Sequence, residues 1–169
     1  MKKQYLPAKM SLLLVIALTG AIAAYAQKDK TDKVAEIKNL VESQRYVFRA
    51  QSAMPMSGQT RQLTSEYDLK VTKDTIVSYL PYFGRAYTAP VDPSQGGIQF
   101  TSTLFEYTIA PHKKGGWDVA IKPKDNRDVQ QMMLNISEAG YASLQVTSIN
   151  RQPISFSGYI TAIKPGKKK

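Results

Sequence analysis

Few residues of this chain have side chains suited to acid–base, nucleophilic or metal chemistry. His112 is the only histidine, and cysteine is absent. A Ser-His-Asp arrangement would have to use His112, which stands between Pro111 and Lys113 at a predicted turn, where a ring is seldom held in a fixed geometry. Zinc sites usually need several His or Cys ligands, and catalytic thiols need cysteine. The sequence therefore predicts no catalytic histidine, no thiol chemistry and no zinc site.

Carboxylates offer two further kinds of site. A pair for glycoside hydrolysis could be drawn from Glu66, Asp68, Glu106 and Asp118. Nothing in the sequence brings two of them together. Calcium prefers oxygen ligands, which cluster at Asp125, Asn126 and Asp128, but Arg127 divides them and the spacing fits no EF-hand loop. A solvated turn explains this cluster more simply, so we expect no metal, no cofactor and no enzymatic activity.

The segment from Tyr79 to Tyr87 is the most unusual in composition, with four aromatic residues and one arginine around a Pro and a Gly. Pro81 cannot donate to a sheet ladder, and Gly84 permits backbone angles that other residues avoid. The segment is therefore predicted to be a rigid loop that leaves a strand. It opens a connection of about seventeen residues, and ordered loops of that length are often functional.

Two roles are open for this loop. Tyr82, Phe83 and Tyr87 could form a stacking platform, with Arg85 donating to a carboxylate, a phosphate or a sugar hydroxyl. Alternatively, the aromatic rings close the mouth of a small barrel and Arg85 bonds backbone carbonyls of the loop. We favour the packing role but take these four residues as candidate ligand contacts.

Two methionines could join the same rim. Met54 and Met56 fall within residues 51–62, which lose periodicity and are predicted to form a loop. Methionine adapts to varied apolar partners, so both residues complete the candidate ligand-binding set.

The elements that position these residues follow from hydrophobic periodicity. Residues 28–44 place Val34, Ile37, Leu40 and Val41 at helical spacing, which predicts one amphipathic helix. Period-two patterns follow, separated by Gly, Pro, Asn and Asp turns. They predict strands at 46–50, 67–71, 75–80, 98–103, 105–110, 117–122, 129–137, 141–148 and 154–160. We expect a mainly β fold of about eight strands, a lipocalin-like antiparallel barrel or a flattened sandwich, because closure removes exposed edges.

The N-terminus has the composition of a secretory signal peptide. Lys2, Lys3 and Lys9 precede an apolar run, and Ala24-Tyr25-Ala26 forms an A-x-A site before Gln27. The apolar run is shorter than the roughly 20 residues of a spanning helix, so no stable membrane span is expected after cleavage between Ala26 and Gln27. Removing 26 residues from 169 leaves 143, enough for one domain over residues 27–163.

Charge does not favour a nucleic-acid partner. Without the three signal-peptide lysines, 20 basic residues face 13 acidic ones, and four of those 20 lie in residues 164–169, a predicted disordered basic tail. A nucleic-acid binder would be expected to gather basic residues on one folded face. The tail is instead expected to help solubility.

Several motifs together resemble a known family. They are Leu40–Ser43, Phe48–Pro55, Leu63–Ser65, Tyr67–Leu69, Tyr79–Ala89, Gly97–Ser102 and Asn150–Ile160. In this order they resemble the domain-of-unknown-function 4251 family of secreted Bacteroidetes proteins. The resemblance implies a lipocalin-type barrel and an envelope location, but supplies no activity and no site residues. Many members look like lipoproteins, whereas this chain lacks the necessary cysteine, so a soluble periplasmic or released form is implied.

The sequence favours a non-enzymatic, exported binding module for a small amphipathic or hydrophobic ligand or for a peptide of another envelope protein. A cell-envelope scaffold or assembly protein, contacting a partner through the helix and the basic tail, is the first alternative. A hydrolase is the second.

Overall fold

The structure is a computed structural model that describes residues 31–87, 96–113 and 115–164. The predicted signal peptide, its cleavage point between Ala26 and Gln27, residues 88–95 of the long loop and residues 165–169 of the basic tail lie outside the described residues. No helix in the described part of the chain combines the length and the hydropathy needed to cross a membrane.

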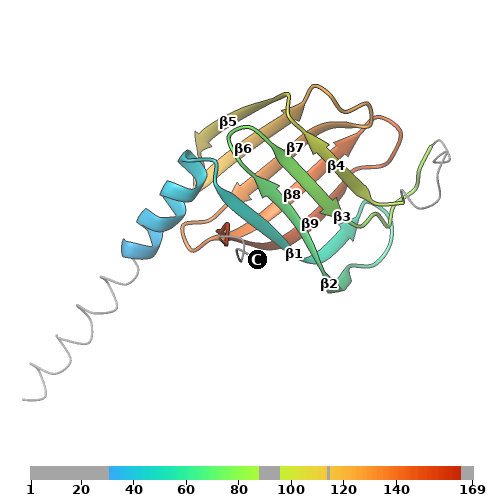
Figure 1. The fold of residues 1–169 in the computed structure, drawn as a ribbon. Helices are drawn as coiled ribbons and strands as arrows, with labels where there is room; N and C mark the ends of the chain where they lie inside the picture. The colour runs from blue at the N-terminus through green and yellow to red at the C-terminus, as the bar shows by residue number, and fades with distance from the viewer. Residues whose placement is uncertain (1–30, 88–95, 114, 165–169) are drawn as a thin grey trace, which may run out of the picture.

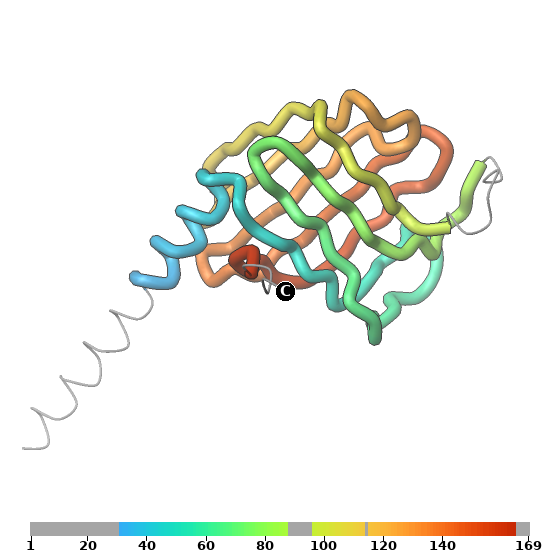
Figure 2. Tube along the Cα trace, in the orientation of Figure 1, coloured from blue at the N-terminus to red at the C-terminus, as the bar shows by residue number. Residues whose placement is uncertain are grey.

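Nine antiparallel strands form one sheet that curls on itself until it is nearly closed (Figures 1 and 2). The strands are β1 (Tyr46–Pro55), β2 (Arg61–Val71), β3 (Ile76–Leu80), β4 (Ile98–Ser102), β5 (Phe105–Pro111), β6 (Trp117–Pro123), β7 (Val129–Ile136), β8 (Tyr141–Ser148) and β9 (Ile154–Ala162). Their order in the sheet is β4-β3-β2-β1-β9-β8-β7-β6-β5. The predicted mainly β fold after one helix is confirmed, with nine strands in place of about eight.

The prediction of a loop over residues 51–62 is wrong at both ends. β1 continues to Pro55 and β2 begins at Arg61, so Met54 lies in a strand and Met56 in a short turn. The register of β1 shifts between Ala50 and Ser52 against both β2 and β9. Against β9 the shift is a bulge in which Gln51 is one extra residue, and it inverts the alternation of inward and outward side chains, which explains why the sequence pattern disappears here.

The interior of the curled sheet is filled by apolar side chains from all parts of the strand sequence. The largest fully buried ones include Tyr46, Phe48, Leu69, Leu134 and Phe156. Because they alternate with more exposed residues along each strand, one face of every strand points inward. This packing accounts for stability in a chain without disulfides.

The N-terminal helix, described over residues 31–42, lies at the end of the sheet where β1 begins (Figure 1). Ile37 and Val41 are buried on its inner face. The Tyr107 hydroxyl donates to the Val41 carbonyl at 3.1 Å, and Tyr46 Oη lies 3.1 Å from Tyr107 Oη. Burial raises the pKa of Tyr107 to about 12, so the hydroxyl stays protonated and keeps β5 joined to the helix.

The two edge strands, β4 and β5, follow one another in sequence, and Asp125 holds the corner between them. Its carboxylate accepts hydrogen bonds from Ser102 Oγ and from the backbone N–H groups of Thr103 and Leu104, the last two at 2.9 and 3.2 Å. The Lys124 N–H donates to the Leu104 carbonyl at 2.7 Å. The β6–β7 connection thereby fixes the corner where an open sheet would otherwise have two loose edges.

The Asp125 carboxylate is expected to make stability depend on acidity. The hydrogen bond from Ser102 is the main cause that lowers the pKa of Asp125 in the folded protein. Stability from a depressed pKa is present above the unfolded-state pKa and is lost as pH falls through the folded-state value. Asp125→Asn should therefore be less stable than the parent in urea unfolding at pH 7, and the difference should shrink toward pH 3. Asp74→Asn, at an exposed position of the β2–β3 turn, is the control, and an equal response of both variants would contradict the corner's role.

Candidate functional site

The predicted ligand loop is bound to the β8–β9 connection. Ala86 forms an antiparallel bridge with Arg151, the Gln152 N–H donates to the Arg85 carbonyl at 3.0 Å, and the Tyr87 N–H donates to the Asn150 carbonyl at 2.8 Å. The Tyr82 hydroxyl lies 2.8 Å from the Arg85 carbonyl and 3.0 Å from the Gln152 carbonyl. Residues 82–87 are therefore held against the β8–β9 connection.

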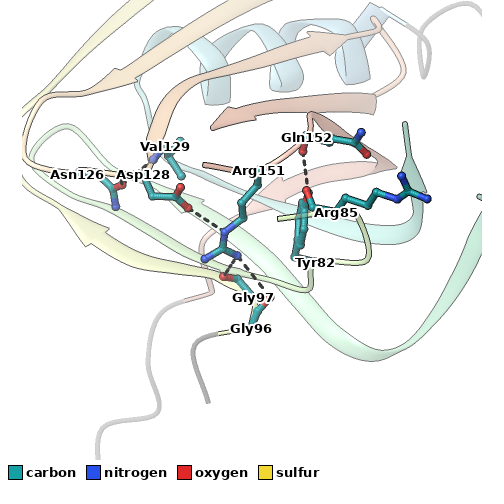
Figure 3. A network of polar contacts seen from close by, with 9 residues as sticks. All are labelled: Tyr82, Arg85, Gly96, Gly97, Asn126, Asp128, Val129, Arg151 and Gln152. Atoms are coloured by element: carbon teal, nitrogen blue, oxygen red, sulfur yellow. Dashed lines mark hydrogen bonds and ion pairs between the residues drawn. The ribbon is translucent and has the colours of Figure 1, made fainter. Parts of the chain in front are cut away.

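Arg151, not Arg85, binds the carbonyls of the long loop (Figure 3). Its Nη1 donates to the Gly97 carbonyl at 2.9 Å, and its Nε lies 3.1 Å from Asp128 Oδ2. Its guanidinium carbon stands 5.3 Å from the centre of the Tyr82 ring. With its side chain 14% exposed and that of Asp128 29% exposed, this ion pair is partly shielded from water. Arg151 joins both ends of the long connection to the start of β7.

Among the described residues, polar and ring contacts do not bring the other predicted ligand contacts into one cluster. The Phe83 ring is covered by the Arg61 guanidinium, 4.9 Å from its centre. Figure 3 shows the Arg85 side chain extending away from Arg151, and Arg85 and Tyr87 are both exposed. Met54 and Met56 are exposed on β1 and on the turn that follows it. A ligand at these residues stays a prediction.

A row of small polar side chains crosses the outer face of the sheet. The strand registers pair Asn135 with Ser143, Ser143 with Ser157, and Ser157 with Ser52, so the row runs from β7 over β8 and β9 to β1. On the β6 side, Asp118 pairs with Asn135 and extends the row. Serine side chains are short, so this row leaves a depression between larger neighbours.

That depression is a groove of about 520 Å³, here named the serine groove. Its polar side chains come from five separate segments and are Gln51, His112, Asn135, Ser137, Tyr141, Ser143 and Ser157. Gln51 is the extra residue of the β1 bulge and stands in the groove because the bulge redirects it. Tyr141, 68% exposed, stands at the side of the groove.

Asp118 orients two of the groove's polar residues. His112 Nδ1 lies 2.9 and 3.0 Å from the two Asp118 oxygens, and Asn135 Nδ2 donates to Asp118 Oδ1. A carboxylate only accepts, so His112 Nδ1 carries a proton, and Nε2 is an acceptor when the ring is neutral. The hydrogen bond from His112 is the main cause that lowers the pKa of Asp118, which keeps this carboxylate ionised. The sequence expectation that His112 lacks a held geometry is wrong.

A second groove of about 470 Å³, the helix groove, adjoins the first. It lies between the N-terminal helix and strands β8 and β9, and its lining includes Lys33, Glu36 and Tyr159. Gln51 and Tyr141 line both grooves. Tyr141 and Tyr159 are direct cross-strand partners, so two tyrosines stand where the grooves meet.

The carboxylates singled out in the sequence are held in separate places. Glu66 pairs with Arg49 at 3.3 Å, and Glu106 pairs with Lys124 at 3.0 Å. The suggested calcium oxygens are also separate: Asn126 Oδ1 accepts from the N–H groups of Asp128 and Val129, while Asp125 holds the β4–β5 corner. Within the described residues, no three acidic, His or Cys side chains are grouped in a way that could hold a metal ion.

The groove residues escaped sequence reasoning because each is ordinary in its own strand. Alternation does place Tyr141 and Ser143 outward on β8, and Ser157 and Tyr159 outward on β9. Alternation within a strand does not specify the register between strands, and it is the register that places these positions side by side. The only local signal is the concentration of serines at outward positions beside Gly158.

Comparisons with known proteins concern the family and the fold. A family model described as "Domain of unknown function (DUF4251)" matches residues 28–160. The chain is similar to a crystal structure of a DUF4251 family protein from Bacteroides eggerthii DSM 20697, with a TM-score of 0.55, 16% identity, and coverage of 79% of this chain and 87% of that chain. No curated protein matches the chain. At this identity the structural likeness concerns the fold alone.

Proposed function

Since the chain belongs to the DUF4251 family, as its motifs predicted, and the family's domain is one of unknown function, we propose from its own geometry that it is an exported, non-enzymatic binding module for a small amphipathic ligand. The serine groove is the binding site. The observation that carries the proposal is the convergence of seven polar side chains from five segments on one open groove of about 520 Å³.

Preorganisation supports binding at this groove. Asp118 fixes His112 and Asn135 before any ligand arrives, which reduces the entropy lost on binding. The strands β7, β8 and β9 each lie between two neighbours in the sheet, so the floor of the groove is rigid. An amphipathic molecule could place its polar edge on the serines and its apolar face against Tyr141.

The acid–base groups favour binding over hydrolysis. Hydrolysis of a glycosidic bond usually needs two carboxylates that flank the bond, and acyl transfer needs a nucleophile hydrogen-bonded to the histidine. Among the described residues that line the serine groove, His112 and Tyr141 are the ones with titratable side chains, and none is Asp or Glu. The Ser137 hydroxyl donates to the Tyr141 carbonyl at 3.1 Å.

The groove can be mapped with small amphipathic probes. Amide NMR spectra of the purified protein titrated with 2-propanol and with 1,4-dioxane should show the largest shift changes at residues 135, 143 and 157. Ser143→Phe should fill the groove and reduce these changes several-fold. Gln145→Phe, at the next outward position of β8 and outside the groove, should leave them as in the parent. Largest changes at Tyr82–Tyr87, or an equal effect of both variants, would contradict the groove as the site.

A further inference from the structure

We propose that the occupant of the two adjoining grooves is a neutral oligosaccharide that lies across the strands of the sheet. This inference rests on the proposed function and names the chemical class of its ligand. It follows from the path of the grooves, from the hydrogen-bonding groups that line them, from the exposed aromatic ring where they meet, and from the charge of the lining.

The path is long enough for a chain of several sugar units. The serine groove and the helix groove measure about 520 and 470 Å³ and share Gln51 and Tyr141. Adjacent strands in a sheet lie about 4.8 Å apart, so the lining from Asn135 on β7 to Gln51 on β1 spans three such intervals. A single monosaccharide would leave most of this path empty.

The lining offers both donors and acceptors at the spacing of the strands. Ser143 and Ser157 carry hydroxyls, each a donor and an acceptor, on neighbouring strands. Asn135 uses its amide nitrogen on Asp118 and keeps its carbonyl oxygen as an acceptor, and His112 offers Nε2 as a second acceptor when its ring is neutral. A polyhydroxylated ligand can donate to these acceptors and share hydrogen bonds with the serines at every position.

Tyr141 supplies the apolar surface that a sugar ring needs. Tyr141 is 68% exposed, and its direct partner Tyr159 is half-buried beside it. The faces of pyranose rings carry C–H groups that pack on aromatic rings while their hydroxyls point sideways. Tyrosine suits this contact because it presents an apolar ring with a polar tip.

A peptide fits the same surface less well. Peptides recognised by sheets add a strand at an exposed edge and gain main-chain hydrogen bonds. The serine groove lies over β7, β8 and β9, whose backbone groups are already committed to neighbours on both sides, whereas the edges of the sheet are β4 and β5. A peptide lying here would find side-chain partners only.

The charge of the lining favours a neutral ligand. No Lys, Arg, Asp or Glu is among the described residues that line the serine groove, and Asp118 beside it on the β6 side is bonded to His112 and Asn135. In the helix groove, Lys33 and Glu36 carry opposite charges. An anionic or cationic polymer would lose its hydration without gaining a matching ion pair in the serine groove.

Calorimetric titration tests the inference. The neutral probes are hexasaccharides: α-1,4-, β-1,4- and β-1,3-linked glucose, β-1,4-linked xylose and β-1,4-linked mannose. Hexagalacturonate and hexaglucosamine are the charged counterparts. At least one neutral hexamer should bind, and its disaccharide should bind at least about tenfold more weakly because it covers one groove only. Tyr141→Ala should weaken that hexamer about tenfold or more, through loss of the exposed ring.

Tyr87→Ala is the matched control, because Tyr87 is 69% exposed and lies at the other end of the sheet. It should leave the affinity within about twofold of the parent, as expected for a position outside the interface. Preference for a charged hexamer, a larger loss with Tyr87→Ala, or no binding of any neutral hexamer would overturn the inference. If the inference fails but 2-propanol and dioxane still shift the amide signals of the serine groove, the proposed function stands without the oligosaccharide. If they do not, both the inference and the proposed function are wrong.

Discussion

Arg151→Met is expected to lower the free energy of unfolding by about 2–3 kcal/mol, and Arg85→Met by less than about 0.5 kcal/mol. Removing Arg151 leaves the Asp128 carboxylate without its cation and the Gly96 and Gly97 carbonyls without their donor. One buried oxygen, Asp128 Oδ1, already lacks a partner within the described residues. The expected destabilisation lies at or below the lower end of the range for breaking a buried ion pair, because the Asp128 side chain is 29% exposed. Urea unfolding followed by tryptophan fluorescence measures both variants.

A double variant separates the ion pair from simple loss of packing. Arg151→Met combined with Asp128→Asn removes the stranded charge, so it should recover about 1 kcal/mol relative to Arg151→Met alone. Equal losses for Arg151→Met and Arg85→Met would show that the network of Figure 3 is not what holds this end of the sheet. A larger loss at Arg85 would favour the role first predicted for it.

Gly158→Ala is expected to destabilise the protein by about 3 kcal/mol or more. A Cβ atom on Gly158 would overlap the carbonyl oxygen of Arg49 and press on the backbone of Ala50. The β1 backbone cannot retreat, because β1 is paired with β2 on its other side. The close approach lies beside the bulge that places Gln51 in the serine groove, so the same substitution should disturb the groove.

Ser157→Ala is the control for Gly158→Ala, since it changes the neighbouring residue on the outer face and should alter stability by less than about 0.5 kcal/mol. Thermal and urea unfolding compare the two. If Gly158→Ala yields no soluble protein while Ser157→Ala does, the expected direction holds. A Gly158→Ala protein within 1 kcal/mol of the parent would contradict the close approach.

Much of the fold could be predicted from the sequence because strands report their alternation locally. Trp117, Val119 and Ile121 on β6 and Ile154, Phe156 and Ile160 on β9 recur at even spacing, which identifies each strand without knowledge of its partner. The pattern failed where the structure breaks it. At the β1 bulge one extra residue inverts the alternation, so a ten-residue strand was divided into a strand and a loop.

The candidate site could not be predicted to the same degree. The aromatic segment around Arg85 favours this arginine as the residue that binds loop carbonyls. In the structure, Arg151 of the β8–β9 connection makes these contacts. The two segments are brought together by the Ala86–Arg151 bridge, which joins residues far apart in sequence. His112 was set aside as a turn residue because its partner Asp118 lies across the β5–β6 hairpin, and only the pairing of Ala110 with Asp118 places them together.

By itself the sequence determined the class of fold, the positions of most strands, the single N-terminal helix and the family. It did so because hydrophobic periodicity and turn residues are local properties of the chain. The tertiary structure alone decided which outward positions are neighbours. It thereby formed the serine groove from Asn135, Ser143 and Ser157, which no local sequence pattern marks as a site. It also decided that the aromatic segment lies against residues 150–152, because the backbone groups of Arg85 and Tyr87 and the Tyr82 hydroxyl form hydrogen bonds with that connection.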